Sequence, residues 1–258
     1  MNKYEKEIEK QLLDNEKEIL KELQKSYTEA LADIKARISD WLNKSDDLTQ
    51  SQIYQLNFQR NLEKQVTSII DVLKNDINSN TNTYLAKMYE DSFIGTSYNL
   101  LKEYNFNTYL EINQLAVLEM VNKPVEDMTF SERTNVNMND FKKKIKSEIS
   151  RGFATSRTYS EMSQSISLIA EKSMYKAYRI ARTEGLRIAS ESKLDYAQKV
   201  KNKYGADLVK QWDSTLDGKT RPEHQELDGQ IRELDEDFEC SSGKAKAPRI
   251  IWKYCNGL

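Results

Sequence analysis

The amino-terminal stretch of the chain carries apolar side chains at helical intervals. From Leu20 to Trp41 successive apolar positions are separated by 3, 4, 4, 3, 4 and 3 residues, Glu and Lys fill most of the intervening positions, and the stripe reaches back to Tyr4. Positions three and four apart share one face of a helix, so the pattern predicts a long amphipathic helix ending near Asn43. Packing in a bundle and pairing in an intermolecular coiled coil are both compatible with it.

A second apolar stripe runs from Ile53 to Ile77. Candidate N-cap residues precede it at 45–47, which predicts a helical hairpin with the first segment. The polar stretch 78–82 indicates a break, although a helix could continue through it. Residues 84–141 favour shorter helices and loops, interrupted by Asn122-Lys123-Pro124.

Thr158-Tyr159-Ser160-Glu161 has the pattern of a capping box. The box predicts a helix that starts there and runs to about Lys203, with Gly185 as its weak point. Small residues recur every four positions along one side, which would let another helix approach closely; they are Ala177, Ala181, Gly185 and Ala189.

The other side of this helix is basic. This basic stripe has two interpretations. It is either a positive face that binds phosphates or an acidic partner, or an ordinary solvated surface. The candidate contact residues are Lys172, Lys176, Arg179 and Arg187.

Residues that break helices gather near the carboxyl end. The chain has 258 residues with 31% charged, but 4 of its 8 glycines and 2 of its 3 prolines lie from Asp217 onward. Short strands are expected at 208–215, 230–234 and 248–254. The predicted fold class is mainly α with a small C-terminal α+β module. The expected domains are a helical body at 1–145, a long helix at 146–204 and a short-stranded, turn-rich β module at 205–258.

The net charge and the lengths of the apolar runs exclude two classes of protein. Lys and Arg number 39 against 41 Asp and Glu, a net charge of −2, so a globally basic nucleic-acid binder is excluded. That average conceals a formal charge of −6 over 217–240 and four bases without an acid over 241–258, stretches that could pair with each other. No apolar run approaches the roughly 20 residues that cross a bilayer. We therefore expect no membrane partner and synthesis in a cytoplasm.

The chain has two cysteines, Cys240 and Cys255, and one histidine, His224. Two cysteines make no disulfide framework, and a single imidazole excludes mechanisms that need two. His224 with Asp217, Asp228 and Cys240 supplies zinc-ligand types, but without C-x-x-C spacing. A zinc site, a metal-dependent hydrolase or nuclease using Asp217, His224 and Asp228, and a purely structural role in turns and a small core all stay open.

Two motifs carry a family resemblance. Ile180-Ala181-Arg182-Thr183-Glu184 lies on the long helix, and a run from Trp212 to Gln230 follows. Together they resemble the phage head morphogenesis or minor head (minor capsid) protein family, the Mu F-like proteins, over about residues 150–250. The matching residues are Arg182, Thr183, Glu184, Trp212, Asp217, Arg221, His224, Asp228 and Gly229.

The resemblance implies a structural protein rather than an enzyme. Such a protein would lie in the virion, in the head interior or at the portal vertex, and would assist prohead assembly, DNA packaging or ejection. Its expected partners are the portal oligomer, a capsid or scaffolding protein, and DNA bound without sequence preference. The family's final N-C-R-C is missing at 255–258, so we expect a shortened β module. Use of the module to dock a phage-carried effector is a further alternative.

Arg182 and Glu184 are two positions apart on the helix and cannot pair as i,i+4 neighbours do. Long-range partners in the terminal module are expected for both. We therefore predict that they form, with Asp217, Arg221, His224 and Asp228, a scaffold that links the helix to the β module.

Overall fold

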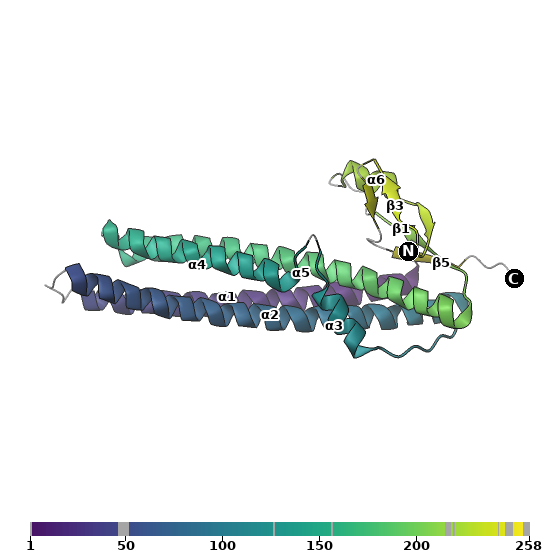
Figure 1. The fold of residues 1–258 in the computed structure, drawn as a ribbon, viewed down its shortest axis with the longest axis horizontal. Coiled ribbons are helices and arrows are strands. Elements are labelled where there is room, and N and C mark those ends of the chain that lie inside the picture. Colours follow the sequence, from purple (N-terminus) through teal and green to yellow (C-terminus); the bar gives the residue numbers. More distant parts are fainter. Residues whose placement is uncertain are drawn as a thin grey trace. The chain divides into compact units, whose positions relative to one another are not determined.

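The computed structural model describes residues 2–45, 52–125, 127–155, 157–214, 218, 220–241, 243–245 and 250–254. Its helices are α1 (Lys3–Ser45), α2 (Gln52–Tyr104), α3 (Gln114–Asn122), α4 (Phe130–Ala154), α5 (Tyr159–Tyr204) and α6 (Pro222–Leu227) (Figure 1). Four of these six helices exceed 20 residues, and the strands all follow α5. The predicted fold class, mainly α with a small C-terminal α+β module, is confirmed.

The helix α2 is longer than the sequence pattern indicates. The polar stretch 78–82 does not end it, and it continues to Tyr104 instead of giving way to shorter elements after Tyr84. The expected break is wrong because apolar residues on both sides of the stretch stay on one buried face, with Ile77 before it and Leu85 after it. Thr81 is buried on the same face. Burial of a continuous face outweighs the weak helix preference of Asn and Thr.

The chain divides into two compact units, and the segments of the two units alternate along the sequence. Unit 1 consists of residues 1–17, 83–123 and 182–258, and unit 2 of residues 18–82 and 124–181. Each of α1, α2 and α5 therefore contributes one part to each unit. The three consecutive domains expected from the sequence stay a prediction.

The core of unit 2 is built from the apolar seams of α1, α2, α4 and α5. Its fully buried side chains include Leu23, Ile34, Val66, Ile70, Ile145, Ile149 and Ile166. A polar layer crosses this core: the hydroxyls of Tyr27 and Ser173 lie 2.8 Å apart, and Asn137 Nδ2 donates to the Ser173 carbonyl at 2.9 Å. Three buried polar groups that satisfy one another fix the register of three helices.

A group of aromatic rings forms part of the core of unit 1. Tyr89 and Phe93 of α2 lie 5.9 Å apart, and the Tyr196 ring of α5 meets Phe93 edge-on at 4.7 Å. Ser92 Oγ donates to the Ala189 carbonyl at 2.7 Å, and Ser192 Oγ donates to the Tyr89 carbonyl at 2.7 Å. These paired serine bonds tie α2 to α5 at a close approach.

The terminal module, residues 205–258, belongs to unit 1 and contains two antiparallel sheets. Strand β1 (Leu208–Trp212) lies between β2 (Ile231–Glu233) and β5 (Ile250–Tyr254), with Val209 opposite both Glu233 and Lys253. These are the three strands that the sequence predicts. The hairpin of β3 (Phe238–Cys240) and β4 (Gly243–Ala245) was not expected, nor was α6.

No helix in the described part of the chain is long and apolar enough to cross a membrane. The mean hydropathy of −0.78 agrees with that finding.

Candidate functional site

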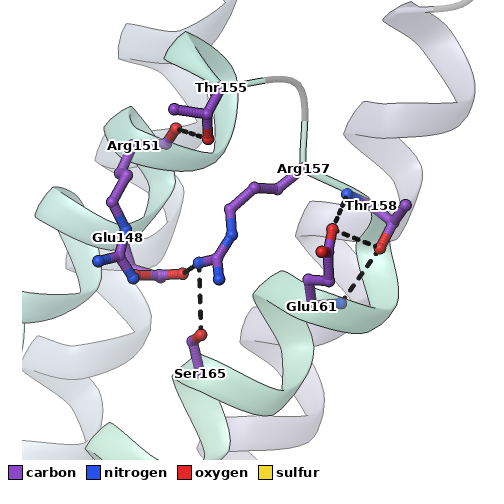
Figure 2. Close-up of polar contacts among 7 residues, drawn as sticks. All are labelled: Glu148, Arg151, Thr155, Arg157, Thr158, Glu161 and Ser165. Atoms are coloured by element: carbon purple, nitrogen blue, oxygen red, sulfur yellow. Dashed lines mark hydrogen bonds and ion pairs between the residues drawn. The ribbon is translucent and has the colours of Figure 1, made fainter.

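The turn between α4 and α5 is held by a buried carboxylate. Glu148 of α4 is 4% exposed and accepts hydrogen bonds from the guanidinium groups of Arg151 and Arg157 (Figure 2). Arg157 precedes α5, so Glu148 ties the entry of one helix to the side of the other. The exposed fraction is 60% for the Arg151 side chain and 29% for Arg157, so only the carboxylate is fully removed from water.

The start of α5 is the capping box that the sequence predicts. The Glu161 amide donates to Thr158 Oγ1 at 3.3 Å, and the Thr158 amide donates to the Glu161 carboxylate at 2.8 Å (Figure 2). These bonds hold the pKa of Glu161 below its ordinary value, because both Thr158 donors favour the charged carboxylate. The helix entry is therefore fixed locally by the box and across the turn by Glu148.

The two helices run antiparallel, and one carboxylate joins them farther along. Asp140 of α4 accepts from Lys144 at 2.8 Å and from Lys176 of α5 at 3.1 Å. The two ammonium groups lower the pKa of Asp140, Lys144 having the larger effect. Lys176 is thus half-buried and paired, whereas Lys172 and Arg179 on the same helix are exposed.

Arg187 does not belong to the exposed basic stripe in which the sequence pattern placed it. Its side chain is 13% exposed and bonds Glu184 at 2.8 Å and Glu191 at 3.1 Å. It also donates to the Met120 carbonyl at the end of α3, at 3.4 Å. The helical-wheel position of Arg187 is correct, but α3 packs over that part of α5 and the sequence gives no sign of this contact.

The three motif residues on α5 lie in different surroundings. Arg182 Nε donates to Glu16 of α1 at 2.8 Å, so its partner is distant in the sequence but does not lie in the terminal module. Glu184 is 2% exposed and bonds Arg187 one turn away. The long-range partner expected for it stays a prediction. Thr183 is exposed between them.

The motif residues of the terminal module converge on Trp212. Its indole N–H donates to Ser214 Oγ at 2.9 Å, and that hydroxyl donates to the His224 carbonyl at 2.7 Å. The Ser214 amide donates to Asp228 Oδ1 at 2.8 Å. The Trp212 ring packs against His224 at 5.8 Å and meets Phe238 at 5.2 Å, and with Leu227 it forms a small core.

Gly229 and Arg221 shape the backbone around that core. Gly229 has φ of +77°, a conformation that side chains disfavour, and its amide donates to the Trp212 carbonyl at 3.0 Å. Arg221 is the N-cap residue of α6, and its carbonyl accepts from the amides of His224 and Gln225. Asp217 lies outside the described residues. The described module residues therefore share one scaffold, and the predicted link from that scaffold to Arg182 and Glu184 stays a prediction.

The described residues contain no group of three or more His, Cys, Asp and Glu close enough to hold a metal ion. His224 and Asp228 are committed to the Trp212 scaffold, and Cys240 Sγ lies 3.5 Å from the Gly243 carbonyl across the β3–β4 hairpin. The predicted zinc site also needs Asp217, so it stays untested.

Sequence reasoning missed Glu148, Asp140 and Ser214. Each is a polar residue in an ordinary helical or loop pattern. Each matters because it bonds a residue of another segment, and the local sequence pattern does not reveal that partner. One signal was available: Glu148 is an acid at a core position of the α4 stripe, one residue before the buried Ile149. A charged residue on an apolar face indicates a paired charge.

Comparison with known proteins agrees with the motifs. The family model described as "Phage Mu protein F like protein" matches residues 143–250, which confirms the family resemblance. The chain is 27% identical over 240 residues to the minor head protein GP7 of Bacillus phage SPP1, covering 88% of this chain and 75% of that protein.

A second relative has an enzyme's name. The chain is 28% identical over 252 residues to the NAD(+)--arginine ADP-ribosyltransferase EFV of Enterococcus faecalis (strain ATCC 700802 / V583). The match covers 97% of this chain and 52% of that protein, so the chain spans about half the length of this relative. No solved structure matches the chain.

Proposed function

From the premise that this chain belongs to the Mu F-like minor head protein family, we propose that it docks on the portal vertex of a phage head. There it assists prohead assembly, DNA packaging or DNA ejection, and it resides in the virion. The observation that carries the proposal is the match of residues 143–250 to the family, which includes the α4–α5 turn and most of the terminal module.

The architecture suits a structural role. The polar layer of Tyr27, Asn137 and Ser173 fixes the packing of three helices within unit 2, and the motif residues around Trp212 hold a small fold. Capsid or scaffolding proteins are further partners in this proposal.

Non-specific DNA contact is the second part of the proposal. Residues 130–181 of unit 2 contain ten Lys and Arg against five Asp and Glu, although the whole chain has a net charge of −2. Cations at this density attract phosphate without reading bases, and such binding weakens steeply with salt.

Co-purification with a portal oligomer, with and without DNA, tests the proposal. We expect the portal to capture the chain in the absence of DNA. Reversing the charges of Lys172 and Arg179 should weaken association with DNA or portal and leave the helix folded. Failure of the portal to capture the unaltered chain under any condition contradicts portal docking.

The hydrolase or nuclease alternative is not favoured. Asp228 accepts a backbone amide and the His224 ring packs on Trp212, so both side chains already have structural partners. Incubation with DNA and Mg²⁺ or Mn²⁺ is the test. Cleavage that is lost in His224→Ala would restore the enzyme hypothesis.

A docking module for a phage-carried effector is a second candidate function. One observation favours it: nearly the whole chain aligns with a protein named as an ADP-ribosyltransferase that is about twice as long. The shared segment would then deliver or anchor an attached activity. Transfer of ADP-ribose from NAD⁺ to an arginine acceptor by this chain would support an enzyme, and capture by the portal without transfer would support the docking module.

A further inference from the structure

We infer that the outward face of α5 in unit 2 is a docking surface for an acidic amphipathic helix of another protein. Four residues form this face, called the outer seam: Leu168, Lys172, Tyr175 and Arg179. The inference deepens the proposed function, on which it rests for the premise that the chain docks on a protein assembly.

The outer seam has the spacing of a helix-packing surface. Its residues are separated by 4, 3 and 4 positions, so they form one continuous stripe. The buried seam of the same helix runs through Ile166, Ala170, Ser173 and Ala177 with spacings of 4, 3 and 4. The helix therefore carries two seams of the same period on opposite sides, and only one of them packs within unit 2.

The apolar members of the outer seam are large and accessible. Leu168 is 53% exposed and Tyr175 is 58% exposed. The Tyr175 ring meets the Tyr178 ring edge-on at 5.9 Å, which restrains Tyr175 before any partner arrives. A single exposed leucine or tyrosine is ordinary on a protein surface. The informative feature is that these two alternate with cations in a helical register.

The charge of the seam selects an acidic partner. Lys172 and Arg179 are exposed and make no ion pair with any residue that the structure describes, whereas the nearby Lys176 is neutralised by Asp140. Glu171 borders the seam, so two cations face one acid, within a segment that carries twice as many bases as acids. Carboxylates on a docking helix would complement this charge.

A helix fits the seam better than a nucleic acid does. A phosphate backbone uses cations and hydrogen-bond donors and gains nothing from the Leu168 side chain, whereas a helix laid along the seam uses both apolar anchors, Leu168 and Tyr175, and the charged flanks. A second copy of this chain fits less well, because the exposed side of α1 in unit 2 carries cations among its acids, such as Lys25, which lies 3.9 Å from Glu29.

The test uses a 28-residue model helix as the probe, with Leu at its heptad a and d positions and Glu at e and g. We expect the full chain to bind it at micromolar concentration in fluorescence anisotropy, and a Lys-for-Glu version of the peptide not to bind. Lys172→Glu with Arg179→Glu should weaken binding at least tenfold. Leu168→Ser with Tyr175→Ser should weaken it at least tenfold as well.

Matched controls lie on the outward side of α4. Lys143→Glu and Val136→Ser alter exposed residues of the same unit outside the seam and should change peptide binding less than twofold. Thermal unfolding by circular dichroism confirms that each variant stays folded.

Three results overturn the inference. They are no binding of the Glu peptide, binding that is insensitive to Leu168→Ser with Tyr175→Ser, and preferential binding of a 30-base-pair DNA duplex through Lys172 and Arg179 alone. Because the probe contains no portal protein, failure of the portal capture experiment leaves this result standing, and the two proposals fail separately.

Discussion

Gly185 of α5 lies directly against the ring of Tyr84 of α2. A Cβ built on Gly185 would lie 2.1 Å from Tyr84 Oη and 2.7 Å from Cζ, far inside ordinary contact. Burial raises the pKa of Tyr84 above its ordinary range, so the phenol stays neutral at this contact. The glycine that the sequence marks as the weak point of the helix is therefore a point of close approach between α2 and α5.

Gly185→Ala should destabilise the protein. Overpacking a tight contact costs about 1–3 kcal/mol, while replacing glycine in a helix gains only about 1 kcal/mol, so the net loss should be up to about 2 kcal/mol. Urea unfolding followed by circular dichroism measures it. Thr183→Ala, two residues away and exposed, should change the free energy of unfolding by less than about 0.5 kcal/mol. A Gly185→Ala protein as stable as the unaltered chain would show that Tyr84 moves aside at no cost.

Substitutions at the α4–α5 turn should lower the free energy of unfolding by different amounts. Arg157→Ala leaves the buried Glu148 carboxylate with a single, mostly exposed arginine and should cost about 2–4 kcal/mol. Glu148→Ala leaves two arginines that water can reach and should cost less, and Arg151→Ala should cost about 0–1 kcal/mol because that arginine is mostly in water. Chemical unfolding of the three variants checks the order. Equal effects would contradict the role assigned to Glu148.

The sequence predicts the helices best where burial follows a simple period. The stripe from Leu20 to Trp41 and the capping box at Thr158 give the correct helix type and, for the box, the correct start. The break expected at 78–82 is wrong because local residue preference is weaker than burial of the face that includes Thr81. Contacts such as those of Glu148 and Asp140 depend on which helix lies alongside, and spacing within one helix carries no information about that.

The same limit applies to the functional residues. The motif from Trp212 to Gly229 is recognisable in the sequence, and its described residues do come together around Trp212. Arg187 shows the opposite case, because its place on the basic stripe is correct on a helical wheel and is overridden by α3. A short helix that covers part of a stripe cannot be inferred from the stripe itself.

Two capping boxes, the one at the start of α5 and a second formed by Thr129 and Glu132 at the start of α4, predict a dependence of stability on pH. Hydrogen bonds from Thr158 lower the pKa of Glu161, and those from Thr129 lower the pKa of Glu132, relative to the ordinary 4.5. A carboxyl whose pKa is lower in the folded state adds stability above its unfolded pKa. That stability is lost as the pH falls below about 4.5 and through the folded values. Unfolding midpoints between pH 3 and 6 should therefore fall less steeply in Glu161→Gln with Glu132→Gln than in the unaltered chain, and parallel profiles would contradict the prediction.

Two substitutions of Asp228 test whether its hydrogen bond holds the terminal module together. Asp228→Asn keeps an oxygen that accepts from the Ser214 amide, so the module should stay folded, with a loss below about 1 kcal/mol. Asp228→Ala removes the acceptor and should cost about 1–3 kcal/mol. Trp212 fluorescence in urea reports on the module, with the other tryptophans replaced by phenylalanine. If both variants unfold alike, the carboxylate charge matters more than the hydrogen bond.

Truncation of Arg187 should destabilise the protein, whereas truncation of Lys172 should leave its stability almost unchanged. Both residues lie on the stripe that the sequence pattern presents as one basic face. Arg187→Ala removes the guanidinium that bonds Glu184, Glu191 and the Met120 carbonyl, and because Glu184 is almost fully buried the loss should be about 2–4 kcal/mol. Lys172→Ala removes an exposed ammonium and should change stability by less than about 0.5 kcal/mol. Any loss of partner binding in Arg187→Glu would therefore reflect altered folding, whereas the same loss in Lys172→Glu would report on the surface. Paired unfolding curves of the two alanine variants check this, and similar stabilities would place Arg187 back on the exposed face.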